Sequence, residues 1–153
     1  MKHILGRYEG NSASDFYLDF KSNDRSFIDM PLRHMSKLTH NLLGAIDYQN
    51  VLFRRNENWH ILHTCFENRN ELSLSCPNGP YMYPLYCENG MEIKLMLAQK
   101  KIFVPTLWPN VLSMENCDLE KDYAENILPL PIDQRYSKED MLFLVKEVLS
   151  CIN

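Results

Sequence analysis

The chain of 153 residues has no long hydrophobic run and no excess of positive charge. No window approaches the roughly 18 apolar residues that a transmembrane helix needs, and the apolar run after Met1 is too short for a signal peptide. With 20 acidic against 16 basic residues, the net charge is −4, and Lys and Arg do not cluster as phosphate binding requires. The composition argues against a membrane protein and against a nucleic-acid-binding protein.

Glycine-rich phosphate loops and paired cysteines are also absent. The 5 glycines form neither GxGxxG nor GxxxxGK, so no nucleotide cradle is predicted. The 5 cysteines are odd in number and contain no CxxC pair, which fits neither a disulfide scaffold nor a zinc ribbon. His60 and His63 have a spacing that can hold a metal, but Cys65 falls on the opposite side of the helix. We therefore expect reduced thiols, no metal site and a cytoplasmic protein.

The composition that remains is that of a globular protein, with 45% hydrophobic and 24% charged residues. Apolar residues at helical spacing predict two successive helices in the first half of the chain, over residues 37–46 and 48–66. Ser36 is positioned to cap the first and Asp47 to cap the second. Shorter helices are predicted at residues 16–20, 91–101, 117–126 and 138–151, with Asn89 and Glu92 opening the second of these and Ser137 and Asp140 the last.

Period-two alternation and flanking turn residues predict short strands between these helices. Pro105, Pro109, Pro129 and Pro131 cannot donate ladder hydrogen bonds, so the strands are expected to be short or to lie at sheet edges. The predicted strands are residues 71–75, 81–87, 103–104 and 127–132. This order of elements predicts an α+β fold, and no internal repeat or low-complexity linker interrupts it.

Four sequence motifs together resemble a known enzyme family. The most specific are FVPTLWPNV at residues 103–111 and LPLPIDQRYSKEDM at residues 128–141, while RHMSK at 33–37 and RRNENW at 54–59 add weaker support. They are similar to the C-terminal part of the DegT-type sugar aminotransferases, fold-type I enzymes that use pyridoxal phosphate. The resemblance spans roughly residues 31 to 152.

The resemblance implies a particular domain organisation. Residues 1–35 would be the remnant of the large-domain end, residues 36–67 the interdomain helices, and residues 68–153 the small C-terminal domain. In that family, long interdomain helices are followed by a small antiparallel sheet of about three strands packed by helices. We therefore expect that arrangement here.

The resemblance also implies that the catalytic machinery lies outside the matched segment. In the family, the Schiff-base lysine, an aromatic residue that stacks on the cofactor and an aspartate facing its pyridine nitrogen all precede this segment. Lys37 is not aligned with the lysine, so no catalytic residue is predicted. Pyridoxal phosphate is expected in the intact relative and not on this chain alone.

Two groups of residues are implied as ligand contacts. Family members often use an Asn and an Arg before the "MS" turn to reach the cofactor phosphate across the dimer, where this chain has Leu32 and His34. The implied cofactor-binding residues are Arg33, His34 and Ser36, although helix capping alone explains Ser36 equally well. Trp108, Gln134, Arg135 and Tyr136 offer stacking, amide and guanidinium chemistry for a sugar substrate, or serve packing and an Asp133 ion pair.

Two hypotheses about function follow from the sequence. The first is the C-terminal domain of an aminotransferase-like protein, a natural truncation or split-gene product, that closes over the amino donor or a nucleotide-linked sugar in polysaccharide biosynthesis and is inactive alone. The second is a non-catalytic dimerisation or protein-binding module with an aromatic stripe of Phe16, Phe20, Tyr48 and Trp59. Possible partners are a second copy or the missing large domain. No residue constellation supports an independent enzyme.

Overall fold

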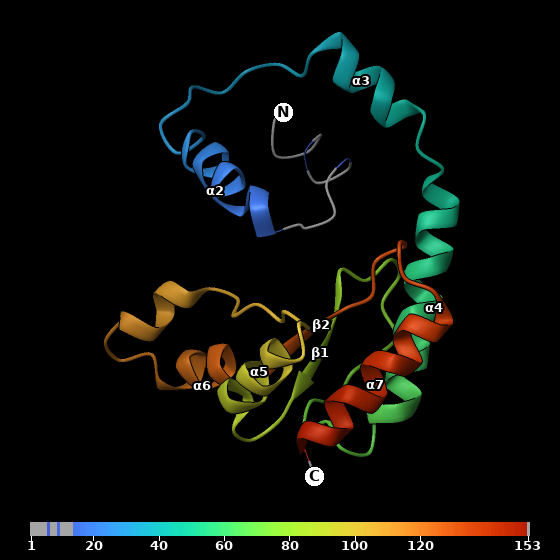
Figure 1. Ribbon diagram of the computed structural model, residues 1–153, viewed down its shortest axis with the longest axis vertical. Coiled ribbons are helices and arrows are strands. Elements are labelled where there is room, and N and C mark those ends of the chain that lie inside the picture. Colours follow the sequence, from blue (N-terminus) through green and yellow to red (C-terminus); the bar gives the residue numbers. More distant parts are fainter. Residues whose placement is uncertain (1–5, 7–8, 10–13, 153) are drawn as a thin grey trace. The chain divides into compact units, whose positions relative to one another are not determined.

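The computed structural model describes Gly6, Glu9 and residues 14–152, so the predicted segment 1–35 lies partly outside the described residues. The chain divides into two units, residues 1–46 and residues 47–153. Figure 1 shows the elements of both along the colour gradient. The boundary falls inside the predicted interdomain segment, at the start of its second helix.

The first unit contains short helices and no core among its described residues. It comprises η1 (Ser14–Phe16), α2 (Tyr17–Arg25) and α3 (Lys37–Gly44), and neither α-helix buries a side chain. Ser36 caps α3 as predicted, because its Oγ accepts the Thr39 N–H at 3.0 Å.

The second unit is an α+β structure, which confirms the predicted class. It contains a two-stranded antiparallel sheet where about three strands were predicted. Figure 1 shows α4 and α7 side by side across the sheet, with α5 contacting α7. Its elements are α4 (Tyr48–Phe66), β1 (Met82–Tyr86), α5 (Gly90–Gln99), η2 (Pro109–Ser113), α6 (Asp118–Asn126), β2 (Ile127–Pro131) and α7 (Lys138–Ile152).

The hydrophobic core lies between one face of the sheet and the helices. Trp59, predicted on an exposed stripe, is 2% exposed because it stacks on His63 and packs edge-on against Tyr83. On α5, Ile93 and Leu97 are buried, whereas Met96 is 37% exposed. The other large core side chains are Leu62, Phe66, Leu85, Leu128, Leu130, Ile132, Met141, Leu144, Val145 and Val148.

Three prolines fit into this small sheet because of the register of its strands. Met82 lies opposite Pro131, and Pro84 lies opposite Pro129. Two opposed prolines cannot exchange N–H···O bonds, so these are the non-hydrogen-bonded pairs of the ladder. The alternate pairs, which include Tyr83 with Leu130, carry the ladder bonds and face the core.

The outer edge of β1 is closed by a side chain, which explains why the strand predicted at residues 71–75 does not form. Asn70 Nδ2 donates to the Pro84 carbonyl at 2.8 Å, and Asn70 Oδ1 accepts the Tyr86 N–H at 3.0 Å. The same oxygen accepts the Leu72 N–H at 3.1 Å. One asparagine thus takes the backbone groups that a neighbouring strand would need, and the strand prediction was wrong.

The outer edge of β2 has no free backbone N–H group, which explains why the strand predicted at residues 103–104 does not form. Residues 103–104 are irregular, although Phe103 lines one cavity with both Pro129 and Pro131. Those prolines present no N–H, and the Ile127 N–H bonds the Tyr123 carbonyl at the end of α6. A third strand therefore finds no ladder of donors on this edge.

Helix starts follow the predicted capping residues with one exception. Asp47 Oδ1 accepts the Asn50 N–H at 3.0 Å. Ser137 and Asp140 form a reciprocal capping box, with bonds of 2.8 and 3.3 Å. The predicted cap of α5 was wrong, because Asn89 is left-handed and makes no side-chain cap bond, and Asn126 Oδ1 accepts the Gly90 N–H instead.

Helix α5 ends in a Schellman motif whose left-handed position is occupied by a lysine. Lys101 has φ +63°, its N–H bonds the Ala98 carbonyl, and the Ile102 N–H bonds the Leu97 carbonyl, both at 2.9 Å. A side chain carrying Cβ is strained there, whereas glycine is not.

We expect Lys101→Gly to raise the free energy of unfolding by about 1 kcal/mol in urea titrations. Gln99→Gly, inside the helix, should lower the free energy of unfolding by about 1 kcal/mol. If both substitutions lowered it, the left-handed conformation of Lys101 would be contradicted.

Candidate functional site

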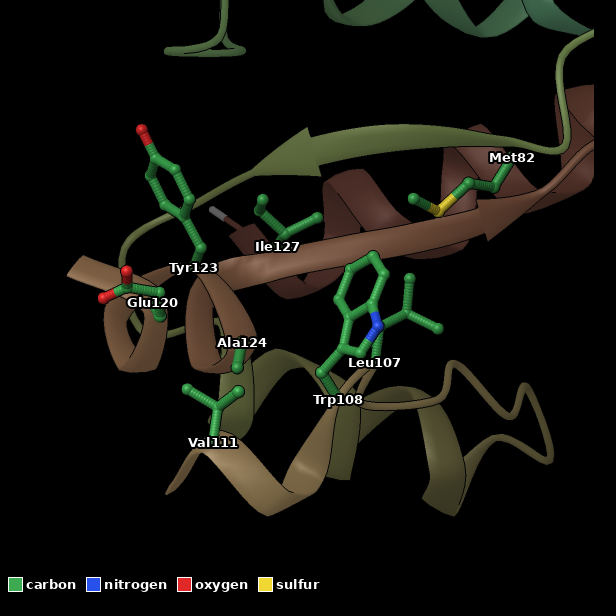
Figure 2. Close-up of a pocket in the computed structure, with 8 residues that line it drawn as sticks. All are labelled: Met82, Leu107, Trp108, Val111, Glu120, Tyr123, Ala124 and Ile127. Carbon is green, nitrogen blue, oxygen red and sulfur yellow. The ribbon is translucent and has the colours of Figure 1, made fainter. Parts of the chain in front are cut away.

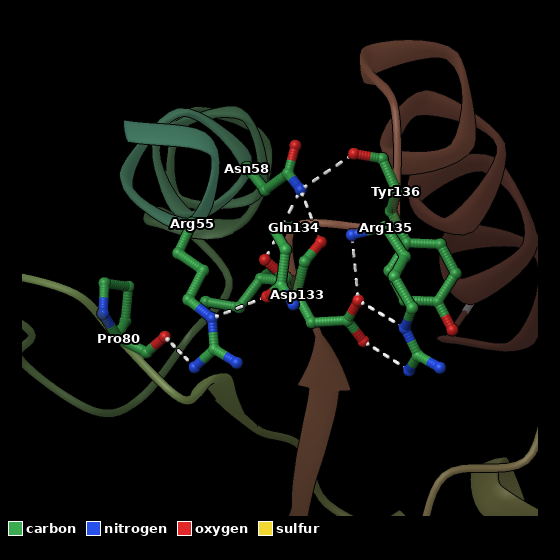
Figure 3. A network of polar contacts seen from close by, with 8 residues as sticks. Arg55, Asn58, Pro80, Asp133, Gln134, Arg135 and Tyr136 are labelled. Atoms are coloured by element: carbon green, nitrogen blue, oxygen red, sulfur yellow. Dashed lines mark hydrogen bonds and ion pairs between the residues drawn. The ribbon is translucent and has the colours of Figure 1, made fainter. Parts of the chain in front are cut away.

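The loop after β2 is fastened to α4 by one buried asparagine. Asn58 is 1% exposed, and its Nδ2 donates to the carbonyls of Ile132 at 3.3 Å, Asp133 at 3.1 Å and Tyr136 at 3.2 Å (Figure 3). These three carbonyls converge because the chain turns between β2 and α7. The side-chain amide therefore fixes the path of residues 132–136, the most specific part of the sequence motif.

Within this loop, Asp133 and Arg135 form a bidentate ion pair. Arg135 Nε and Nη2 each donate to a different carboxylate oxygen at 2.8 Å, and the Arg135 N–H donates to Oδ1 at 3.0 Å. The guanidinium beside Asp133 holds the pKa of that carboxyl below its usual range. The Arg135 side chain is still 76% exposed, so it is oriented by Asp133 and also open to solvent.

Arg55 of α4 ties two distant loops to the same place. Its Nε donates to Gln134 Oε1 at 3.1 Å, and its Nη1 donates to the Pro80 carbonyl at 3.3 Å. No carboxylate forms an ion pair with Arg55 in the part of the chain that the structure describes. Its guanidinium is therefore hydrogen-bonded to neutral groups, and its positive charge also helps to lower the pKa of Asp133.

These residues surround a cavity of about 490 Å³, called here the arginine cavity. Arg55, Gln134 and Arg135 supply its polar end, and the second face of the sheet supplies apolar wall. Arg55 Nη2 and Arg135 Nη1 have no hydrogen-bond partner among the described residues. The remaining lining residues are Tyr81, Met82, Phe103, Pro105, Leu107, Pro129, Pro131, Ile132 and Asp133.

The predicted substrate residues are distributed over three cavities. Gln134 and Arg135 share the arginine cavity, but Tyr136 lines a separate one beside Phe143 on α7. Trp108 lines a third cavity, against α6 (Figure 2). The structure therefore brings together two of the four residues and adds Arg55, which the sequence had indicated only as part of the weaker motif at residues 54–59.

The predicted cofactor residues belong to the first unit. Arg33 and His34 are exposed on the irregular stretch before α3, and Ser36 is the cap of that helix. Each has solvent-facing polar atoms, and Ser36 Oγ lies 2.8 Å from Thr39 Oγ1.

Lys94 is a buried lysine that the sequence analysis did not single out. It is 6% exposed, and its Nζ donates to the carbonyls of Ala124 at 3.0 Å and Glu125 at 2.9 Å, at the C-terminal end of α6. Burial lowers the pKa of this lysine. Its position between Ile93 and Leu97 on the buried side of α5 was the signal that could have identified it. The ammonium group holds two helices together.

Cysteine environments differ sharply within the second unit. Cys87 is 8% exposed, and burial raises its pKa to about 11. Cys65 and Cys76 are exposed, and Cys76 Sγ lies 3.4 Å from His60 Nε2, a pair that sequence reasoning did not find. In the part of the chain that the structure describes, no group of three or more His, Cys, Asp and Glu side chains could hold a metal ion.

This difference gives a chemical test of the core. We expect iodoacetamide at pH 8 to modify Cys65 and Cys76 in the folded protein and to leave Cys87 unmodified, because the thiolate is the reactive form. Peptide mass spectrometry before and after addition of urea measures this. Modification of Cys87 at the rate of Cys65 in the native protein would show that β1 does not end in a closed core.

Comparisons with known proteins do not add a relative. No family model matches the chain, and neither the curated proteins nor the solved structures contain a match. The resemblance to DegT-type aminotransferases is therefore a hypothesis that rests on the motifs in the sequence. Among the described residues, no helix has the length and apolar character to cross a membrane.

Proposed function

We propose that residues 47–153 are a ligand-covering domain of the kind that closes over the substrate in DegT-type sugar aminotransferases, acting in the cytoplasm and not catalytic alone. The motif residues 132–135 carry this proposal, because all four line one cavity. Asn58 holds the backbone of this loop there, and Arg55 holds the Gln134 side chain. On this proposal, the two-stranded sheet is the reduced counterpart of the family's small-domain sheet. In the intact relative, pyridoxal phosphate would supply the amino-group transfer chemistry.

The charge of the arginine cavity indicates the ligand. Two guanidinium groups with free Nη donors lie at one end, and the single carboxylate in the lining, Asp133, is already neutralised by Arg135. Guanidinium groups match the oxygen geometry of phosphates, and the prolines and Leu107 offer a surface for an apolar ring face. A nucleotide-linked sugar, with its diphosphate, fits this pattern better than a neutral sugar.

The disposition of Lys94 supports the non-catalytic part of the proposal. A lysine that attaches pyridoxal phosphate needs an accessible and unprotonated Nζ. Lys94 has the lowered pKa, but its Nζ is committed to two backbone carbonyls and lies in the core. The lowered pKa of Lys94 would favour attachment of pyridoxal phosphate, but its buried and hydrogen-bonded Nζ prevents it.

Calorimetric titration of the whole chain with UDP-N-acetylglucosamine tests the ligand. We expect saturable binding that weakens about ten-fold in Arg135→Gln, since one charge-assisted hydrogen bond is lost. Arg54→Gln is the matched control, because Arg54 is adjacent on α4 but forms a surface ion pair with Glu57 at 3.0 Å. Equal affinities of Arg135→Gln and the parent chain, or no binding by the parent chain, would contradict the proposal.

A second function, assembly through the first unit, is favoured by one observation. Helices α2 and α3 bury no side chain, and several apolar side chains of this unit are largely exposed: Leu18, Phe27, Ile28, Leu32, Leu38 and Leu42. Exposed apolar surface of this kind is typical of a protein interface. Light scattering on the purified chain distinguishes a dimer from a monomer, and a monomer at all concentrations would exclude self-association.

A further inference from the structure

A second cavity lies on the far side of Met82 and Leu107 from the arginine cavity, and its chemistry is different. It has a volume of about 250 Å³ and an almost wholly apolar wall. Figure 2 shows Ile127 and Met82 from the strands on one side and Val111 and Ala124 from η2 and α6 on the other, with the Trp108 indole between them. This space is called here the Trp108 cavity.

Trp108 is held over the cavity by an uncommon backbone conformation. Its φ is +49° and its ψ +51°, and it precedes Pro109, the first residue of η2. A bulky residue in this left-handed region is strained by about 1–2 kcal/mol, which persists only where the surrounding structure enforces it. The indole is nevertheless 69% exposed. An aromatic face is thus fixed at the mouth of an apolar space without being buried by the protein itself.

The only charged side chain of the lining is a carboxylate. Glu120, in the first turn of α6, is exposed and has no hydrogen bond or ion pair among the described residues, and the lining contains no Lys, Arg or His. A cation at the Glu120 end of the cavity is therefore attracted by the carboxylate, and a hydrocarbon group attached to it can lie against the Trp108 indole. An anion meets repulsion from the carboxylate with no compensating charge.

We propose that the Trp108 cavity binds a small organic ammonium ion, with its hydrocarbon part inside the cavity against the Trp108 indole and its ammonium group at Glu120 (Figure 2). An apolar cavity of about 150 Å³ already accepts a benzene ring. The larger volume found here accommodates a phenyl-sized group with a short chain to the charged nitrogen. Of its lining, this site shares Met82 and Leu107 with the arginine cavity, and it does not depend on the function proposed above.

Three probes of nearly equal shape and different charge test this site: phenethylammonium, 2-phenylethanol and 3-phenylpropionate. The chain has 2 tryptophans, so the indole N–H resonance of Trp108 reports binding, while that of the buried Trp59 is the internal reference. We expect phenethylammonium to bind about five-fold or more tightly than 2-phenylethanol. We expect 3-phenylpropionate to bind more weakly than either.

Variants separate the charge from the cavity. Glu120→Gln should bring the affinities of the three probes within about two-fold of one another, because only the charge preference is removed. Glu125→Gln, on the same helix but outside the lining, should leave them unchanged. Val111→Phe, which fills the cavity, should abolish binding of all three. No binding of the cation, equal affinities in the parent chain, or a preference for the anion would overturn the proposal.

Discussion

Replacing Asn58 with aspartate is expected to lower the free energy of unfolding by about 3 kcal/mol. The change keeps the shape of the side chain but replaces its donor by a carboxylate oxygen. That oxygen would face the carbonyls of Ile132, Asp133 and Tyr136, all of which are acceptors. At 1% exposure, water cannot replace the lost donor. Urea unfolding followed by circular dichroism measures the change.

A neighbouring asparagine supplies the control for this experiment. Asn56 uses its Oδ1 to accept the Gly79 N–H at 2.9 Å, so Asn56→Asp keeps the acceptor and should change stability by less than about 1 kcal/mol. Both substitutions add one negative charge to the same helix. Similar losses in the two variants would show that charge, and not the lost donor, destabilises the fold, and that Asn58 does not fix residues 132–136.

Lys94→Met is expected to lower the free energy of unfolding by about 2 kcal/mol. Methionine fills a similar volume, but it leaves the carbonyls of Ala124 and Glu125 without their donor at the end of α6. The ammonium group also complements the negative end of that helix. Lys94→Arg should recover part of the loss, because a guanidinium can still donate to both carbonyls.

The comparison for Lys94 is a lysine at the far end of the same helix. Lys100 forms an ion pair with Glu147 of α7 at 2.9 Å, with 38% of the lysine side chain exposed. Exposed pairs of this kind contribute less than about 1 kcal/mol, so Lys100→Met should be nearly neutral. Thermal unfolding at pH 7 measures the loss of stability in both variants. A larger loss for Lys100→Met than for Lys94→Met would contradict the structural role of Lys94.

Helices were predictable from sequence because their signals are local. The caps of Ser36, Asp47 and Ser137 each bond a residue three positions along the chain, so residue spacing alone identifies them. The bounds of the other predicted helices agree within two residues, but α2 continues to Arg25 where a helix over residues 16–20 was predicted. Asn89 was predicted to cap α5 but does not, because the Gly90 N–H at the start of this helix donates to Asn126 Oδ1, a residue distant in sequence.

The number of strands could not be predicted because pairing depends on what occupies each sheet edge. Residues 71–75 have suitable alternation, but the Asn70 side chain occupies the edge of β1. Residues 103–104 lie near β2, whose edge donors are replaced by Pro129 and Pro131. The absence of both strands therefore depends on contacts between distant segments, which the residue pattern of one segment cannot predict.

The candidate site was predicted in part. Gln134 and Arg135 do line one cavity, but their helix partners Arg55 and Asn58 were not recognised as polar contacts. A signal existed, because Arg55 stands in the apolar stripe of α4 and a polar residue there needs a buried partner. Which loop supplies that partner is set by the packing of α4 against α7, about eighty residues away in sequence.

The most direct test of the account is to incubate the whole chain with pyridoxal phosphate, reduce with borohydride and map the products by peptide mass spectrometry. The account predicts no stoichiometric attachment to any lysine and no turnover of amino acids. One phosphopyridoxyl group per chain at a single lysine, together with amino-acid turnover that is lost when that lysine is changed to arginine, would contradict it.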